Sequence, residues 1–208
     1  MTTQTRKQSL RQSIIAARQK MTAAERAALS RVITLRMLDL TSYKASGTVL
    51  AYMSFGAEFA SGVFVQQALR DGKQVLLPRV NSQTKQLELF QVVDLQQDVA
   101  PGKWAIPEPL SARCRKVDDL ERVDFILLPG VAFARDGSRL GYGGGFYDKL
   151  LARIAPAFGD CHPVLVAAAF SMQLANDLPQ EATDRKVGWL ITENEVIDCG
   201  SEQNRLNG

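Results

Sequence analysis

Short, continuous apolar runs recur along this chain and leave few folds open to it. Five of them are separated by segments with helical spacing or by stretches rich in glycine and proline. They are residues 48–52, 74–78, 124–129, 163–170 and 187–191. Runs of about four to eight apolar residues between turn residues are typical of strands that a parallel sheet buries on both faces. The sequence therefore predicts an α/β protein with a mainly parallel sheet.

The spacing of apolar residues also predicts helices. They recur every three or four positions over residues 5–20. Thr22 and Glu25 then form a capping-box pattern that opens a second helix reaching Leu40. A third helix lies between the first two apolar runs and ends at Gly72. Because a helix that joins parallel strands crosses over the sheet right-handedly, we expect a three-layer α/β/α domain preceded by two N-terminal helices.

The chain length is ordinary for a single domain. We expect residues 1–208 to form one domain, with residues 1–4 and 200–208 flexible at its ends. Alternating apolar residues over 87–91 predict a half-exposed strand. Residues 101–109 contain three prolines and are expected to form a fixed loop.

Several classes of protein are excluded by composition. The apolar runs are far shorter than the roughly 20 residues that span a bilayer, and the N-terminus lacks an apolar signal-peptide core. Cys114, Cys161 and Cys199 are too few and too widely spaced for a disulfide framework or a zinc site. The only histidine, His162, is interpreted as a turn residue, which leaves no Ser/His/Asp or Cys/His set. We expect a cytoplasmic protein that does not enter a membrane.

The N-terminal segment is strongly basic. Residues 1–36 hold eight Lys or Arg and one acid, Glu25, whereas the whole chain carries a net charge of only +3. Such a segment attracts anions. A phosphate-bearing small ligand, a nucleic acid, an organelle transit peptide and a solvated helix face are all compatible with it. Because it has no interleaved aromatic residues and no nucleic-acid-binding motif, we expect a small phosphate ligand and no nucleic acid.

Glycines gather before a predicted helix in the second half of the chain. Gly141, Gly143, Gly144 and Gly145 precede a helix that begins at about Phe146. Backbone N–H groups without Cβ atoms approach a phosphate closely, and the helix directs its positive end at the same anion. The spacing matches neither the dinucleotide-binding fingerprint nor the Walker loop. ATP phosphates are the expected ligand, although these glycines alone are equally compatible with a flexible turn.

The residues around these glycines carry a specific resemblance. Leu-Leu-Pro-Gly-Val-Ala-Phe at 127–133, followed by Asp-Gly-x-Arg-Leu-Gly-x-Gly-x-Gly-Phe-Tyr-Asp at 136–148, closely resembles the signature of the 5-formyltetrahydrofolate cyclo-ligases, also called methenyltetrahydrofolate synthetases. Four further stretches resemble the same family. Residues 7–11 match its nucleotide-contacting stretch, 52–58 its folate-side loop, 104–109 its Trp-x-Ile-Pro segment, and 183–193 complete the match. The resemblance covers about residues 5–195.

The resemblance implies an enzyme that uses ATP and Mg²⁺ to convert 5-formyltetrahydrofolate into 5,10-methenyltetrahydrofolate, with release of ADP and phosphate. In this family the formyl oxygen is understood to be phosphorylated before a neighbouring folate nitrogen closes the ring. Such transfer needs positioning and charge neutralisation more than a protein nucleophile. The implied fold is related to that of sugar-phosphate isomerases and CoA transferases. The expected partner is the small-molecule folate, with or without a polyglutamate tail, and the expected state is a monomer.

The resemblance also assigns roles to individual residues. It implies ATP binding by the N-terminal helix and the glycine-rich segment, namely Lys7, Gln8, Ser9, Leu10, Arg11, Arg139, Leu140, Gly141, Tyr142, Gly143, Gly144, Gly145, Phe146 and Tyr147. It implies folate binding by Met53, Glu58, Trp104, Phe146 and Tyr147, and Mg²⁺ binding by Asp148 and Asp184. Arg139 is expected to act in catalysis by stabilising the transferred charge. Lys7 and Arg11 lie four positions apart on one helical face, so both can reach one polyphosphate.

The glycine-rich segment departs from the animal enzymes of this family. Tyr142 and Gly144 stand where those enzymes have an arginine and a lysine. The departure leaves open which groups offset the phosphate charge. A ligand sensor that binds without turnover, a folate-storage protein and an unrelated ATP-dependent kinase are the competing interpretations.

Overall fold

The computed structural model describes residues 2–102, 106–157, 163–181 and 184–200. Helices α1 (Thr3–Gln19), α2 (Ala23–Asp39) and α3 (Thr41–Ala45) open the chain. The predicted capping box at the start of α2 is confirmed. The Thr22 hydroxyl accepts a hydrogen bond from the Glu25 N–H at 3.1 Å, and the Glu25 carboxylate accepts one from the Thr22 N–H at 2.7 Å.

Strands and helices follow, but they alternate less regularly than the apolar runs predict, because several strands succeed one another directly. The elements up to the middle of the chain are β1 (Thr48–Leu50), α4 (Ser61–Arg70), β2 (Gln74–Asn81), β3 (Gln86–Val92), α5 (Leu95–Asp98), β4 (Val99–Pro101), β5 (Pro107–Pro109) and β6 (Arg115–Val117). Those that follow are β7 (Phe125–Leu127), β8 (Ala132–Phe133), β9 (Arg139–Leu140), α6 (Phe146–Ile154), β10 (Val164–Ala168), β11 (Trp189–Ile191) and β12 (Val196–Asp198), with short 3-10 helices at Ala155–Ala157 and Ser171–Gln173.

Eight of the described strands form one sheet in the order β12-β11-β10-β7-β1-β2-β3-β6. The pairs β11/β10, β10/β7, β7/β1 and β1/β2 are all parallel. Strand β3 pairs antiparallel with both β2 and β6, and the edge strand β12 pairs antiparallel with β11. The mainly parallel sheet is confirmed.

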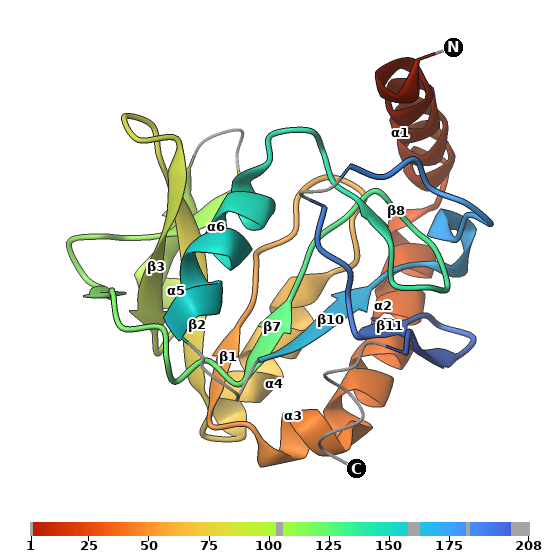
Figure 1. The fold of residues 1–208 in the computed structure, drawn as a ribbon. Coiled ribbons are helices and arrows are strands. Elements are labelled where there is room, and N and C mark those ends of the chain that lie inside the picture. Colours follow the sequence, from red (N-terminus) through yellow and green to blue (C-terminus); the bar gives the residue numbers. More distant parts are fainter. Residues whose placement is uncertain (1, 103–105, 158–162, 182–183, 201–208) are drawn as a thin grey trace.

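Helices cover both faces of this sheet. Successive residues of a strand point to opposite faces, so Val49 packs in the cluster that contains Phe64 of α4, whereas Leu50 packs in the cluster that contains Leu150 of α6. Figure 1 shows α4 and α6 on opposite sides of the sheet, with α1 at the upper right. The three-layer architecture with preceding N-terminal helices is thereby confirmed. No helix in the described part of the chain has the length and apolarity needed to cross a membrane.

Residues 101–109 correct one prediction. The chain was expected to form only a fixed loop there, but β4 and β5 pair antiparallel, with Pro101 opposite Pro107. Prolines lack an N–H group, yet they are compatible with a two-stranded edge ladder because their carbonyl groups still accept hydrogen bonds. The Gly102 N–H donates to the Ile106 carbonyl at 2.8 Å. Trp104 lies outside the described residues.

Parallel neighbours bring the candidate site together. Strands β1 and β7 are adjacent, with Leu50 opposite Ile126. The segment that resembles a folate-side loop follows β1, and the glycine-rich segment follows β7 after the hairpin β8/β9. Because parallel strands end at the same edge of a sheet, both segments lie at one edge.

Candidate active site

The glycine-rich segment links β9 to α6 as an open turn. Gly143 and Gly145 have positive φ angles of 99° and 63°, a region that other residues rarely adopt. Gly145 stands at the N-cap of α6 without a side chain to cap it. A Cβ on Gly144 would lie 2.8 Å from the Phe146 ring. The segment therefore presents uncapped backbone N–H groups at the positive end of a helix.

An ion pair closes this turn at its base. Arg139 comes directly before the turn and Asp148 follows it in the first turn of α6. The Arg139 Nη2 donates to Asp148 Oδ1 at 2.5 Å, and its Nη1 donates to the Pro129 carbonyl at 3.1 Å. The Arg139 side chain is 4% exposed, and its Nε has no hydrogen-bond partner among the described residues. A buried guanidinium thus lies beneath the glycines with one donor unused.

Helix α1 packs against the same turn with its basic side chains. The Arg11 Nε donates to the Gly141 carbonyl at 2.7 Å. The buried Lys7 Nζ donates to Asp184 Oδ2 at 2.8 Å and lies 3.5 Å from Glu181. Burial raises the pKa of Asp184, but hydrogen bonds from Lys7 and the Glu181 N–H outweigh it and lower the pKa. The charges of Lys7 and Arg139 lower it further.

A second group of polar side chains surrounds Glu58. This residue is 6% exposed, and its carboxylate accepts hydrogen bonds from the Tyr142 hydroxyl at 2.5 Å and the Phe55 N–H at 3.0 Å. Burial raises the pKa of Glu58, although both hydrogen bonds and the charge of Arg18 oppose the rise. The Tyr142 ring lies 5.3 Å from the Phe55 ring, centroid to centroid.

The structure brings most of the predicted site residues to one region. Arg11 and Arg139 contact the glycine-rich turn, and Asp148 pairs with Arg139. Lys7 pairs with Asp184, whose pKa the charge of Arg139 also lowers. Tyr142 joins this group to Glu58.

Other predicted residues lie differently. Leu10 and Leu140 pack together in a small apolar cluster, and Gln8 and Ser9 are exposed on α1. Met53, Phe146 and Tyr147 are half-buried side chains that pack against the core.

Two residues of the region were not among the individual site residues predicted from the sequence. Arg18 is 4% exposed and donates to the Tyr142 hydroxyl at 2.6 Å. Tyr52 is buried, and burial together with the charge of Glu58 raises its pKa. Arg18 follows Arg11 by seven positions, so it lies on the same face of α1. This spacing was the available signal for Arg18.

Each of the two predicted metal ligands keeps one carboxylate oxygen that could contact a magnesium ion held mainly by phosphate oxygens. Asp148 and Asp184 each use one oxygen for a cation, and the other oxygen accepts no hydrogen bond from the described residues. Mg²⁺ is commonly held by one or two carboxylates together with substrate phosphates. No group of three or more His, Cys, Asp or Glu within the described ranges is arranged to hold a metal by itself.

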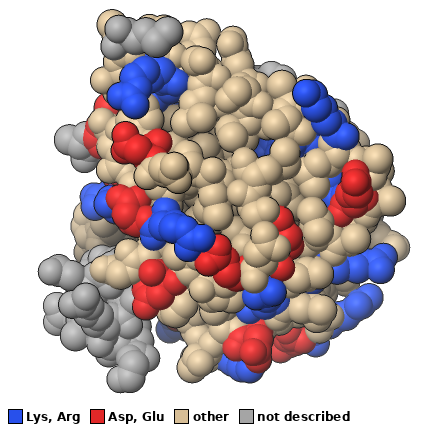
Figure 2. Space-filling model, turned by 90° about the vertical axis from the view of Figure 1, so that its right-hand side faces the viewer, with Lys and Arg blue, Asp and Glu red and all other residues tan. Residues whose placement is uncertain are grey.

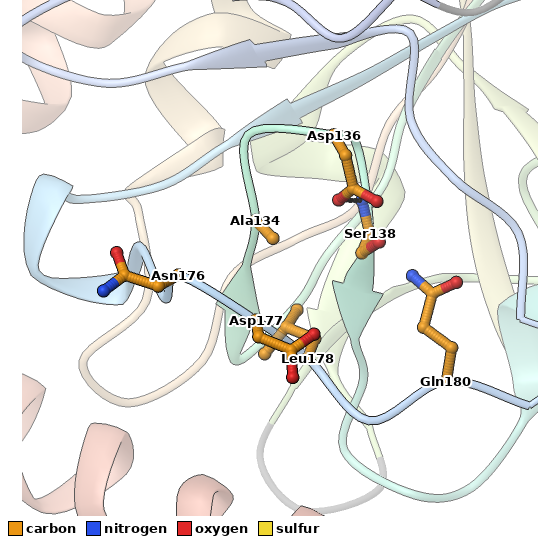
Figure 3. A pocket seen from close by; sticks show the side chains of 7 residues that line it. All are labelled: Ala134, Asp136, Ser138, Asn176, Asp177, Leu178 and Gln180. Carbon is orange, nitrogen blue, oxygen red and sulfur yellow. Dashed lines mark hydrogen bonds between the residues drawn. The ribbon is translucent and has the colours of Figure 1, made fainter.

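A polar pocket of about 240 Å³ lies beside the hairpin β8/β9 (Figure 3). Its walls come from the hairpin and from residues 176–180, and they are Ala134, Asp136, Ser138, Asn176, Asp177, Leu178 and Gln180. It contains none of the predicted site residues. Its two carboxylates make it unsuited to a phosphate.

The basic excess of α1 and α2 is distributed over separate contacts. Lys7 and Arg18 are buried at the site, and Arg26 donates to the Met21 carbonyl at 2.7 Å. Figure 2 shows basic and acidic side chains interspersed over the face that forms the right-hand side of Figure 1. These basic side chains therefore make separate local contacts and do not form a continuous basic stripe on this face (Figure 2).

Known proteins match this chain along nearly all of its length. A family model described as the 5-formyltetrahydrofolate cyclo-ligase family matches residues 3–193. The 5-formyltetrahydrofolate cyclo-ligase of Mus musculus is 26% identical over 197 residues, which cover 93% of this chain and 97% of that protein. The Escherichia coli protein of the same name is 29% identical over 179 residues, covering 86% and 96%. The NMR structure of Aquifex aeolicus 5,10-methenyltetrahydrofolate synthetase matches with a TM-score of 0.79 and 31% identity, covering 94% of this chain and 93% of that one.

Proposed function

Because the chain belongs to the 5-formyltetrahydrofolate cyclo-ligase family, we propose that it converts 5-formyltetrahydrofolate into 5,10-methenyltetrahydrofolate at the expense of ATP, with Mg²⁺ bound. One observation carries this proposal. Arg11 and Arg139 contact a glycine-rich turn, Asp148 pairs with Arg139, and Lys7 of the same helix as Arg11 pairs with Asp184. Such a set offers positive charge to a polyphosphate and oxygen ligands to its metal.

The difficult step is the departure of the formyl oxygen, which is a poor leaving group. The formyl oxygen attacks the terminal phosphorus of ATP, and ADP leaves. The neighbouring folate nitrogen then attacks the activated carbon and loses its proton, and the C–O bond breaks to release phosphate. No protein nucleophile is needed. The chain has to align the two substrates and to stabilise charge on the phosphoryl oxygens.

Lys7, Arg11 and Arg139 supply this stabilisation. In the protein alone, Lys7 and Arg139 are neutralised by Asp184 and Asp148. A bound polyphosphate offers new acceptors to both cations, and its metal offers a new partner to both carboxylates. The N–H groups at the start of α6 add donors that cost little reorganisation because the glycine backbone already exposes them. Asp148 and Asp184 would hold Mg²⁺, which would supply positive charge to the phosphates.

Glu58 would hold the folate ring. Its buried carboxylate can accept hydrogen bonds from ring N–H groups, and the half-buried Met53 lies in the same segment to cover apolar atoms. Phe146 and Tyr147 add aromatic surface at the start of α6. The site thus spans two adjacent loops, one for each substrate.

A spectrophotometric assay tests the proposal. Purified protein is mixed with 5-formyltetrahydrofolate, Mg²⁺ and ATP, and appearance of the methenyl chromophore is followed, with ATP omitted as control. We expect product only with ATP. Folate binding without product would favour a storage protein or sensor, and a stable phosphorylated product would favour a kinase.

Three further properties belong to the same proposal. We expect a monomer, which size-exclusion chromatography with light scattering tests. We expect the cytoplasm as the compartment, in keeping with the free thiols of Cys114 and Cys199. Competition between mono- and polyglutamylated folates tests whether the tail contributes to binding.

A further inference from the structure

Tyr142 joins three segments that are distant in sequence. Its backbone belongs to the glycine-rich turn, yet its hydroxyl lies between Arg18 of α1 and Glu58 of the loop after β1. The Arg18 Nη2 is 2.6 Å from this hydroxyl, and the hydroxyl is 2.5 Å from Glu58 Oε1. The residue links the nucleotide side of the proposed site to its folate side.

The direction of these hydrogen bonds is fixed by chemistry. An arginine side chain has donors and no acceptor. The Tyr142 hydroxyl must therefore accept from Arg18, and its single proton must point to Glu58. Glu58 then accepts one hydrogen bond at Oε1, from the Tyr142 hydroxyl, and one at Oε2, from the Phe55 N–H. Two accepted hydrogen bonds favour the ionised carboxylate.

The surroundings of Glu58 disfavour its charged form, and these hydrogen bonds oppose that effect. Burial raises its pKa, and the groups that face it are Arg18 from α1, Tyr142 from the turn, Tyr147 from α6 and Tyr52 after β1. Burial also raises the pKa values of the three tyrosines, so they are neutral at neutral pH. Arg18 supplies positive charge that opposes protonation of Glu58.

Arg18 occupies this position at an energetic cost. Its side chain is buried, and its Nε–H has no partner among the described residues. An unpartnered buried donor is uncommon and destabilising. Its guanidinium also lies 5.9 Å from the centre of the Tyr142 ring.

We propose that Arg18 is a positioning residue for folate: through the Tyr142 hydroxyl it holds Glu58 ionised and aimed to accept N–H groups of the substrate ring. The inference rests on the proposed function for the identity of the ligand. It gives Tyr142 a role on the folate side in addition to its place in the nucleotide turn.

Two measurements on the full-length protein test this proposal. In the first, the Glu58 carboxyl is titrated by NMR in protein with ¹³C-labelled glutamate, its resonance being assigned by its loss in Glu58→Gln. Arg18→Met is expected to raise the pKa of Glu58, and Arg18→Lys to raise it less. An unchanged pKa in Arg18→Met would overturn the proposal without reference to any ligand.

In the second, the dissociation constant of 5-formyltetrahydrofolate is measured by fluorescence between pH 5.5 and 8, without ATP. For Arg18→Met we expect binding about tenfold weaker than wild type at pH 6 and close to wild type at pH 8. The difference depends on pH because more of the Glu58 carboxyl in the variant is protonated at the lower pH. Tyr142→Phe keeps the ring and should show the same pattern. Combining both changes should weaken binding no further than the stronger single change, because the two groups act in series.

The control is Arg31→Met, which removes an exposed arginine of α2 and should leave the pH profile unchanged. Equal weakening at every pH in Arg18→Met would show a purely structural role and overturn the proposal. If Arg18→Met raises the pKa of Glu58 but the wild-type protein binds no folate, the folate assignment and the proposed function are both overturned. If Arg18→Lys binds the folate at pH 6 more tightly than Arg18→Met does, the proposal is supported.

Discussion

Lys7 and Asp184 stand 177 positions apart in the chain, and the Lys7 Nζ donates to the Asp184 Oδ2 at 2.8 Å. The lysine side chain is 7% exposed and the aspartate side chain 22%. The pair ties α1 to the segment that precedes β11. It also places a lysine and a carboxylate of the proposed nucleotide site in contact before any ligand arrives.

This pair predicts a pH-dependent stability. The pKa of Asp184 is lowered in the folded protein, so its contribution to stability is complete above the unfolded value of about 3.9 and is lost as pH falls through the folded value. Asp184→Asn should therefore be destabilising at pH 7, and the difference from wild type should shrink below about pH 4. Urea unfolding of both proteins at several pH values measures this difference in the free energy of unfolding. Asp177→Asn, at the exposed pair with Arg6, should change little. A difference that is constant down to pH 3 would contradict this account.

Asp148→Asn should abolish turnover and leave the fold intact. The amide keeps the size of the side chain and loses the charge that the proposed metal site requires. Asp136→Asn is the matched control, because Asp136 also pairs with a cation, Lys186, in the neighbouring hairpin. Steady-state rates and circular dichroism are compared for both variants. Normal rates in a folded Asp148→Asn protein would remove this carboxylate from the metal site.

Arg139→Lys should lower kcat by roughly 100-fold, a magnitude typical of the loss of one charge-stabilising donor. A lysine cannot contact Asp148 and the Pro129 carbonyl with two separate nitrogens as the guanidinium does. Arg135→Lys provides the control, since Arg135 lies in the same hairpin and pairs with Glu195 at the surface. If both variants kept wild-type kcat, Arg139 would have no special part in transfer.

Gly145→Ala separates backbone strain from ligand binding. At φ of 63° an alanine costs roughly 1–2 kcal/mol, and no atom lies within 4 Å of the added Cβ. Gly72→Ala is its match, with φ of 75° and equally open space, but it follows α4 away from the site. Thermal unfolding should show similar losses for both. Only Gly145→Ala should weaken binding of a non-hydrolysable ATP analogue, and equal affinities in the two variants would contradict the proposed phosphate turn.

Elements that depend only on neighbouring residues were predicted correctly from the sequence alone. The capping box at Thr22, the buried strands and the helix after the glycines all follow from spacing and from backbone preferences of a few neighbouring residues. The prediction of a plain loop at residues 101–109 was wrong because a strand pair depends on a partner. The short hairpin β8/β9 was missed for the same reason, and it places Arg139 in a strand.

The identity of each side chain's partner was decided only by the tertiary structure. The sequence determined that α1 carries Lys7, Arg11 and Arg18 on one face, but not that each meets a different group. The adjacency of β1 and β7 sets residues 52–58 beside the glycine turn and so brings Tyr142 to Glu58. Such contacts arise because packing of the whole sheet fixes the distance between segments, and no local spacing encodes that distance.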